Sequence, residues 1–133
     1  MLPPEYENWA KGAASYFRDT YGLEGNFALA AARLYVALWG AGLNPRITSG
    51  FRDPAKQKVM RDAWDRGERA GLRARPAASS QHTHTNWLGR PASRAIDMVS
   101  SDEKRAADIA TRLGGIGAGL LFSQPDPGHY YAV

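Results

Sequence analysis

Three histidines and two aspartates are the residues of this chain whose types and spacing could do chemistry. His82 and His84 lie in a segment rich in Ser, Pro and Gly, and His129 follows Asp126 by three residues. Asp97 interrupts an apolar run, where a carboxylate is costly unless it is paired or bound to a metal. Two histidines and one aspartate from separate segments are the ligand set of an open catalytic zinc site, which keeps a fourth position for water.

A zinc site of this kind needs a second carboxylate beside it. The ion lowers the pKa of a bound water and polarises a carbonyl, and a general base then accepts the proton of that water. Asp126 is the candidate base. Simpler interpretations stay open, because Asp97 could form an ion pair with Arg94 or Arg52, and Asp126 before Pro127 is a common turn pair.

Composition limits the class of protein that can carry such a site. The 133 residues suit one domain over 1–133, and 44% hydrophobic with 23% charged residues is typical of a globular chain. The absence of Cys excludes disulfide scaffolds, Cys-based zinc fingers and cysteine nucleophiles. The net charge of +4 fits solubility, and it also fits attraction to an anionic partner such as nucleic acid or a bacterial wall polymer.

The chain lacks the sequence signals of membrane insertion and export. No stretch approaches the roughly 20 apolar residues of a membrane span. The start of the chain has neither a basic region nor an apolar core, as a secretory signal would. We therefore expect a protein made in the cytoplasm without a signal peptide and without membrane insertion.

Hydrophobic periodicity and turn residues predict the elements that must position these groups. The predicted helices are 4–21, 26–41, 54–71 and 102–113, and the predicted strands are 45–50, 94–99, 120–123 and 129–133. A turn is predicted over 124–128, and 72–94 reads as a loop whose length is typical of functional loops. Helices come first and strands mix with helices later, which favours an α+β fold with a small antiparallel sheet flanked by helices.

Three separated motifs carry a resemblance to a known family. They are SGFRDPAKQ over 49–57, SQH over 80–82 with AID over 95–97, and DPGH over 126–129. In this order they resemble the M15 group of zinc D,D-peptidases, which includes D-alanyl-D-alanine carboxypeptidases and phage endolysins that cut the L-alanyl-D-glutamate bond. The resemblance implies a hedgehog/D,D-peptidase-like fold with a helical part over 1–45 and a metal-site part over 46–133.

The chain departs from the family's pattern between the first two ligands. The family's aspartate follows its histidine more closely than here, where Asp97 comes 15 residues after His82. Residues 83–94 therefore look like an insertion. We choose His82 as the ligand because a serine precedes it by two residues as in the motif, and His84 is the alternative.

The resemblance implies a role for each matching residue. The implied zinc ligands are His82, Asp97 and His129. Asp126 would be the general base and then the proton donor to the leaving amine. Arg52 would contact the substrate or stabilise the oxyanion, and Ser80 and Gln57 would help to bind the substrate.

The function implied is hydrolysis of peptidoglycan stem peptides by a Zn²⁺-dependent endopeptidase that cuts after L-alanine, as in endolysins. Alternatives with the same site are a D,D-carboxypeptidase and a secreted antibacterial effector. A catalytically inactive wall-binding or structural phage module is the alternative of another class. We expect a monomer that binds no nucleic acid and acts on the wall or in the periplasm. A holin or secretion machinery would deliver it, and an effector would have a cognate immunity protein.

Overall fold

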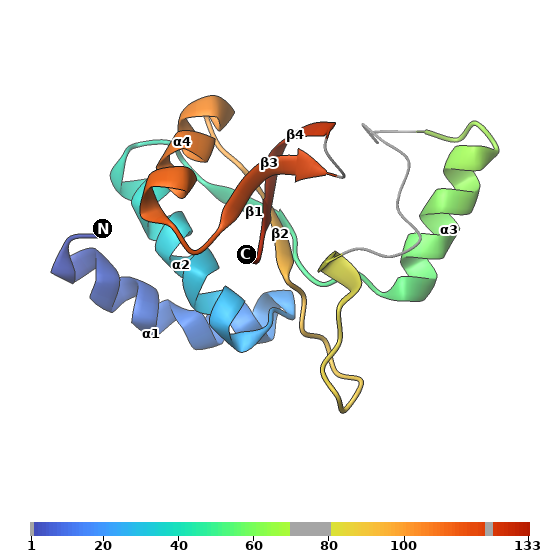
Figure 1. The fold of residues 1–133 in the computed structure, drawn as a ribbon, viewed down its shortest axis with the longest axis horizontal. Helices are drawn as coiled ribbons and strands as arrows, with labels where there is room; N and C mark the ends of the chain where they lie inside the picture. Colours follow the sequence, from blue (N-terminus) through green and yellow to red (C-terminus); the bar gives the residue numbers. More distant parts are fainter. Residues whose placement is uncertain (1, 70–80, 122–123) are drawn as a thin grey trace.

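A four-stranded antiparallel sheet and four α-helices make up the described part of the chain, residues 2–69, 81–121 and 124–133, in a computed structural model (Figure 1). The helices are α1 (Pro4–Tyr21), α2 (Gly25–Gly40), α3 (Pro54–Asp65) and α4 (Glu103–Leu113). The strands are β1 (Arg46–Ser49), β2 (Ala95–Val99), β3 (Gly117–Leu121) and β4 (Gln124–Tyr131), in the order β1-β2-β4-β3. The predicted α+β fold with a small antiparallel sheet is thereby confirmed.

The helices α1 and α2 pack against each other through an apolar face. Pro4 opens α1, where the missing N–H is no loss, and Gly22 ends it in the left-handed conformation at φ 61°. The Glu24 side chain caps α2 by accepting the backbone N–H of Asn26 at 2.9 Å. Leu34 and Leu38 are fully buried, and this face forms most of the hydrophobic core.

The two faces of the sheet have different partners. On one face Ile96 lies opposite Tyr130 in the β2–β4 ladder, and Met98 lies opposite Ile47 in the β1–β2 ladder. Ile96, Met98 and Tyr130 are buried in the core with α2 and α4. In Figure 1 α1, α2 and α4 gather on one side of the sheet, and α3 lies beyond its other side.

Helix α3 is shorter than predicted. It ends at Asp65 rather than near 71, because Gly67 adopts φ 90°. The Glu68 N–H then bonds the Ala63 carbonyl at 2.9 Å and the Gly67 N–H bonds the Trp64 carbonyl at 2.9 Å, a Schellman ending.

The hairpin of β3 and β4 also differs from the prediction. β3 begins at Gly117 rather than 120, and β4 begins at Gln124, where a turn was predicted. The small residues of this segment show no hydrophobic alternation, so the strand leaves no pattern in the sequence. A Cβ at Gly117 would overlap the ring of Tyr131 on the partner strand, so a side chain there would require that ring to move.

Within the described residues, no helix combines the length and apolar character needed to cross a bilayer.

Candidate metal centre

The sheet register places three polar residues in one row across three strands. Asp97 of β2 pairs with His129 of β4 on one side and with Ser49 of β1 on the other. Because partners in an antiparallel ladder project to the same face, these side chains share the face opposite Ile96 and Met98. The candidate centre is therefore built on rigid strands.

A single turn of 3₁₀ helix, η1 (Gln81–Thr83), brings His82 to this row. Its backbone is held from both sides, since the Arg52 N–H bonds the His82 carbonyl and the Arg94 N–H bonds the Gln81 carbonyl, each at 2.8 Å. The His82 Nδ1 lies 2.8 Å from the Gly50 carbonyl oxygen. A carbonyl only accepts, so Nδ1 carries the proton and Nε2 presents its lone pair to the centre.

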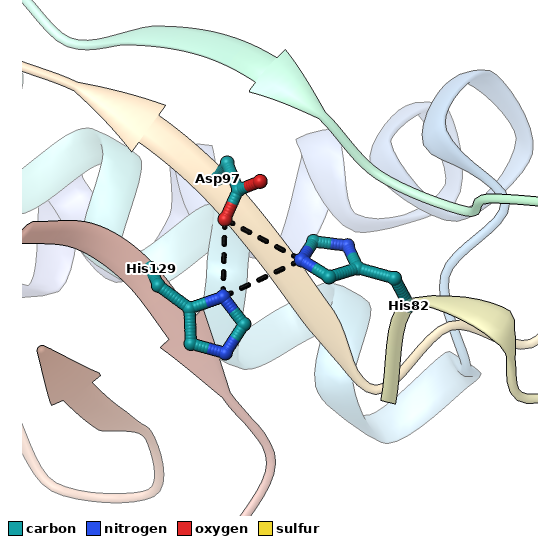
Figure 2. A group of neighbouring side chains, drawn as sticks. All are labelled: His82, Asp97 and His129. Carbon is teal, nitrogen blue, oxygen red and sulfur yellow. Dashed lines mark hydrogen bonds and ion pairs between the residues drawn. The ribbon is translucent and has the colours of Figure 1, made fainter. Parts of the chain in front are cut away.

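The three ligand atoms converge, as Figure 2 shows. His129 Nδ1 lies 3.1 Å from Asp97 Oδ1, and His82 Nε2 lies 3.4 Å from each of these atoms. Atoms at tetrahedral corners about 2.0–2.1 Å from Zn²⁺ are about 3.3–3.4 Å apart. The three pairwise distances thus match the spacing that one tetrahedral ion requires.

Burial and charge make this cluster a strong place for a cation. Both imidazoles are buried, with 4% of the His82 and 8% of the His129 side chain exposed. Burial by itself raises the pKa of the Asp97 carboxyl, but the neighbouring imidazoles of His129 and His82 outweigh burial and hold that pKa well below its ordinary range. Asp97 is therefore ionised at neutral pH, as a metal ligand must be.

Arg52 lies at the edge of the cluster and is held in place. Its Nη1 donates to Gln57 Oε1 at 2.9 Å and its Nη2 to Ser49 Oγ at 3.4 Å. Nη2 is also 3.9 Å from Asp97 Oδ2, so the ion pair considered from the sequence exists beside the histidine contacts. Because Gln57 is only 2% exposed, it fixes the guanidinium without contacting solvent itself.

The remaining predicted site residues have separate outcomes. Asp126 lies beside the cluster, with Oδ2 4.0 Å from His129 Nδ1 and 24% of its side chain exposed. His84 is exposed and lies outside the cluster of the described residues, with Nδ1 2.9 Å from the Ala92 carbonyl. Arg94, the other partner considered for Asp97, lies instead beside Glu24, with Nε 3.8 Å from Glu24 Oε2. Ser80 falls outside the described residues.

Sequence reasoning missed the groups that support the cluster from behind. Fully buried Ser93 donates its hydroxyl proton to the Ala95 carbonyl at 2.7 Å, and its Oγ also lies 3.3 Å from the Gln81 carbonyl oxygen, so Ser93 packs between η1 and β2. The Gly50 carbonyl that orients His82 has no side chain to announce it. Ser93 stands between Ala92 and Arg94, and its hydroxyl is the one feature of these supporting groups that the sequence displays.

The corner between α1 and α2 docks onto the same segments. The Phe51 N–H bonds the Tyr21 carbonyl at 2.7 Å, and the Ser93 N–H bonds the Gly22 carbonyl at 2.8 Å. A Cβ on Gly50 would overlap the Tyr21 carbonyl oxygen, so only glycine permits this approach. The helical pair thus sets the place of both backbone segments that hold His82.

Comparison with known proteins finds similarity at the level of structure. No protein-family model and no curated protein matches the chain. A structure of the LD-carboxypeptidase LdcB aligns with TM-score 0.57 and 20% identity over 84% of this chain and 59% of that chain. The L-Ala D-Glu endopeptidase ChiX of Serratia marcescens aligns with TM-score 0.56 and 16% identity over 99% of this chain and 89% of that chain. The chain thus spans about three fifths of LdcB and shares one fold with both peptidases.

Proposed function

We propose that this chain is a zinc-dependent peptidoglycan peptidase that hydrolyses stem-peptide bonds of the bacterial cell wall. The observation that carries the proposal is the convergence of His82 Nε2, Asp97 Oδ1 and His129 Nδ1 within 3.4 Å of one another. The motifs that resemble the M15 group supply these three residues. The two similar structures are an LD-carboxypeptidase described for its recognition of peptidoglycan and an L-Ala D-Glu endopeptidase.

The donor set favours zinc. Two neutral imidazoles and one carboxylate form a borderline-soft, three-residue set that suits Zn²⁺ with one open position, whereas Mg²⁺ and Ca²⁺ prefer oxygen ligands. When bound, the ion would act as a Lewis acid on the scissile carbonyl and lower the pKa of the attacking water.

Asp126 is the proposed general base. Its carboxylate stands beside His129 without being one of the three converging groups, and it is partly open to solvent. It would accept the proton of the attacking water and deliver it to the amine that leaves when the C–N bond breaks. One group therefore serves both halves of the reaction.

Arg52 is the proposed stabiliser of the oxyanion. Gln57 and Ser49 hold its guanidinium at the cluster's edge, so the positive charge is in place before negative charge develops on the carbonyl oxygen. A fixed guanidinium also suits a carboxylate of the substrate, Ser80 is a further proposed substrate-binding residue, and buried Gln57 would help to bind the substrate through Arg52.

Among the bonds of the stem peptide we favour the one between L-alanine and D-glutamate. The 126–129 motif resembles the ending of endolysins that cut this bond, and ChiX, an endopeptidase of that name, aligns over 89% of its own chain. The protein would act as a monomer on the wall or in the periplasm, after release through a holin or delivery by a secretion machinery. A delivered effector would be neutralised in its producer by an immunity protein.

Digestion of purified peptidoglycan, followed by mass analysis of the fragments, tests the proposal. We expect the wild type to release new amine ends at D-glutamate and new carboxyl ends at L-alanine. Asp126→Asn should bind zinc as the wild type does and lower the rate by about 10²–10⁴-fold, the usual effect of losing a general base.

The alternatives give different products. Free D-alanine would indicate a D,D-carboxypeptidase. Zinc-loaded protein that releases nothing would contradict the substrate class and support an inactive wall-binding module. Equal rates for the wild type and Asp126→Asn would contradict the role of Asp126.

A further inference from the structure

The segment between His82 and Asp97 forms a compact hairpin, residues 84–92, called here the 84–92 hairpin. Its strands meet through the bridge between Thr85 and Pro91, and the Ala92 N–H bonds the His84 carbonyl at 3.0 Å. In Figure 1 it projects away from the sheet and the helices. It leaves the chain two residues after His82 and returns five residues before Asp97, so its base is fixed to the candidate centre.

Asn86 makes the tip of the hairpin a defined structure. Its side-chain oxygen accepts the N–H groups of Leu88 and Arg90 at 2.9 and 3.1 Å. The Asn86 backbone N–H donates to the Arg90 carbonyl, and its carbonyl accepts the Gly89 N–H, each at 2.9 Å. Gly89 adopts φ 75° to close the turn. The tip is therefore held in one shape before any partner binds.

This tip presents one aromatic ring to solvent. Trp87 is 90% exposed, the highest value among the exposed large apolar side chains of the described residues. Leu88 beside it is 53% exposed. Two apolar side chains form too small an area for insertion into a bilayer, but one open indole face suits a flat partner.

The charge of this segment selects the kind of partner. The 84–92 hairpin contains Arg90 and no Asp or Glu, so it carries one positive charge. A sugar ring presents C–H bonds that pack on the negative face of an indole, and a polymer of sugars bearing peptides with free carboxylates adds charge complementarity. Peptidoglycan has both features.

We propose that the 84–92 hairpin binds the glycan strand of peptidoglycan, with Trp87 stacked on a sugar ring while a stem peptide occupies the centre beside His82. This inference rests on the proposed function, and it adds a glycan subsite to that site. A soluble stem peptide without sugars reaches only the centre, so the hairpin should favour the intact polymer.

Two measurements test the inference. The first is sedimentation of the zinc-loaded protein with insoluble peptidoglycan and with glycan strands stripped of peptide. The second is the ratio of hydrolysis rates on intact peptidoglycan and on soluble stem peptide. For Trp87→Ala we expect about tenfold weaker binding to both polymers and about a tenfold lower rate ratio, while Trp87→Phe keeps most of both.

Trp39→Ala is the matched control. Trp39 is also exposed, at 56%, but lies in the last turn of α2 against Trp9, with ring centroids 5.8 Å apart. This variant should bind and cleave as the wild type does. Unfolding curves of Trp87→Ala should superpose on the wild type, because the replaced ring is almost wholly in solvent.

The other results overturn the inference. Wild-type binding by Trp87→Ala, or an equal loss in Trp39→Ala, would show that the hairpin is no glycan subsite. Sedimentation with anionic lipid vesicles that depends on Trp87, without such dependence on glycan, would assign the tip to a membrane surface. Glycan binding through Trp87 in a protein that cleaves nothing would leave the subsite standing and refute the proposed function instead.

Discussion

The helical pair α1–α2 and the described residues beyond 45, which form the sheet, η1, α3 and α4, differ in whether they bury polar side chains. The residues buried along α1 and α2 are all apolar: Ala10, Phe17, Phe27, Ala28, Ala31, Ala32, Leu34, Val36 and Leu38. All four buried polar residues among the described ones lie beyond residue 45: Gln57, His82, Ser93 and His129. Burial of polar groups is costly unless every group is partnered, so the second region contributes less to the stability of the fold than the first.

This contrast separates the work of the two regions. The apolar pair holds the fold together, and its corner at Tyr21 and Gly22 fixes the segments around Gly50 and Ser93. The polar region gives up apolar burial to bring three ligand atoms together. Changes in the first region should therefore alter stability, and changes in the second should alter metal binding and rate.

The largest expected effect separates two histidines of the polar region. His82→Ala removes one of three converging donors, so zinc affinity should fall by more than the roughly 10–100-fold typical of losing an outer-shell partner. Hydrolysis should cease. His84→Ala should keep its zinc, because His84 bonds the Ala92 carbonyl outside the cluster. Titration with zinc of both apoproteins measures the difference, and a reversed order would make His84 the ligand.

The next effect lies in the apolar region. Leu34 is fully buried in α2, and Leu34→Ala should lower the free energy of unfolding by about 2–5 kcal/mol through lost burial and the cavity left behind. Zinc affinity of the folded protein should stay within about twofold. Urea unfolding and zinc titration at low temperature check both statements. A large loss of zinc affinity would mean that the two regions are not separable.

A smaller effect is expected from the buried polar residue that holds Arg52. Gln57→Leu removes the oxygen that accepts from Arg52 Nη1, so the guanidinium loses one of its fixed contacts. We expect kcat to fall about tenfold, in the range of outer-shell partners, with zinc affinity unchanged. Adding Arg52→Lys should then cost less than it does in the wild type. Full additivity of the two changes would show that Gln57 does not act through Arg52.

The smallest effect concerns the ion pair of the helical region. Arg33 Nε lies 3.0 Å from both oxygens of Glu7, and this hydrogen bond, foremost, lowers the pKa of Glu7 below its ordinary 4.5. Stability from the pair is therefore present above pH 4.5 and is lost as pH falls through the lowered pKa. Glu7→Gln should flatten the acid limb of the stability curve slightly. Unchanged acid denaturation relative to the wild type would show that the pair contributes nothing.

Local patterns predicted the parts of the fold that have local causes. The apolar spacing along α1 and α2 identified these two helices, and β2 was found from its alternating run. The end of α3 was missed because the helical pattern of the sequence continues beyond Asp65, whereas a Schellman turn at Gly67 ends the helix there. The start of β3 was missed because Gly117 and Gly119 have no side chains to show an alternation.

The sequence by itself determined the donor types and the order of the motifs. Without Cys, any catalytic metal site of this chain had to use imidazoles and carboxylates, and the sequence contains three histidines. Tertiary structure decided which of them meet. Asp97 and His129 are 32 residues apart and face each other through strand register. His82 joins them because the Gly50 carbonyl fixes its ring, while His84 turns into the base of a hairpin. Backbone carbonyls and loop paths carry no side-chain signature, so the sequence favoured His82 over His84 through the motif alone, and the structure supplies the physical reason.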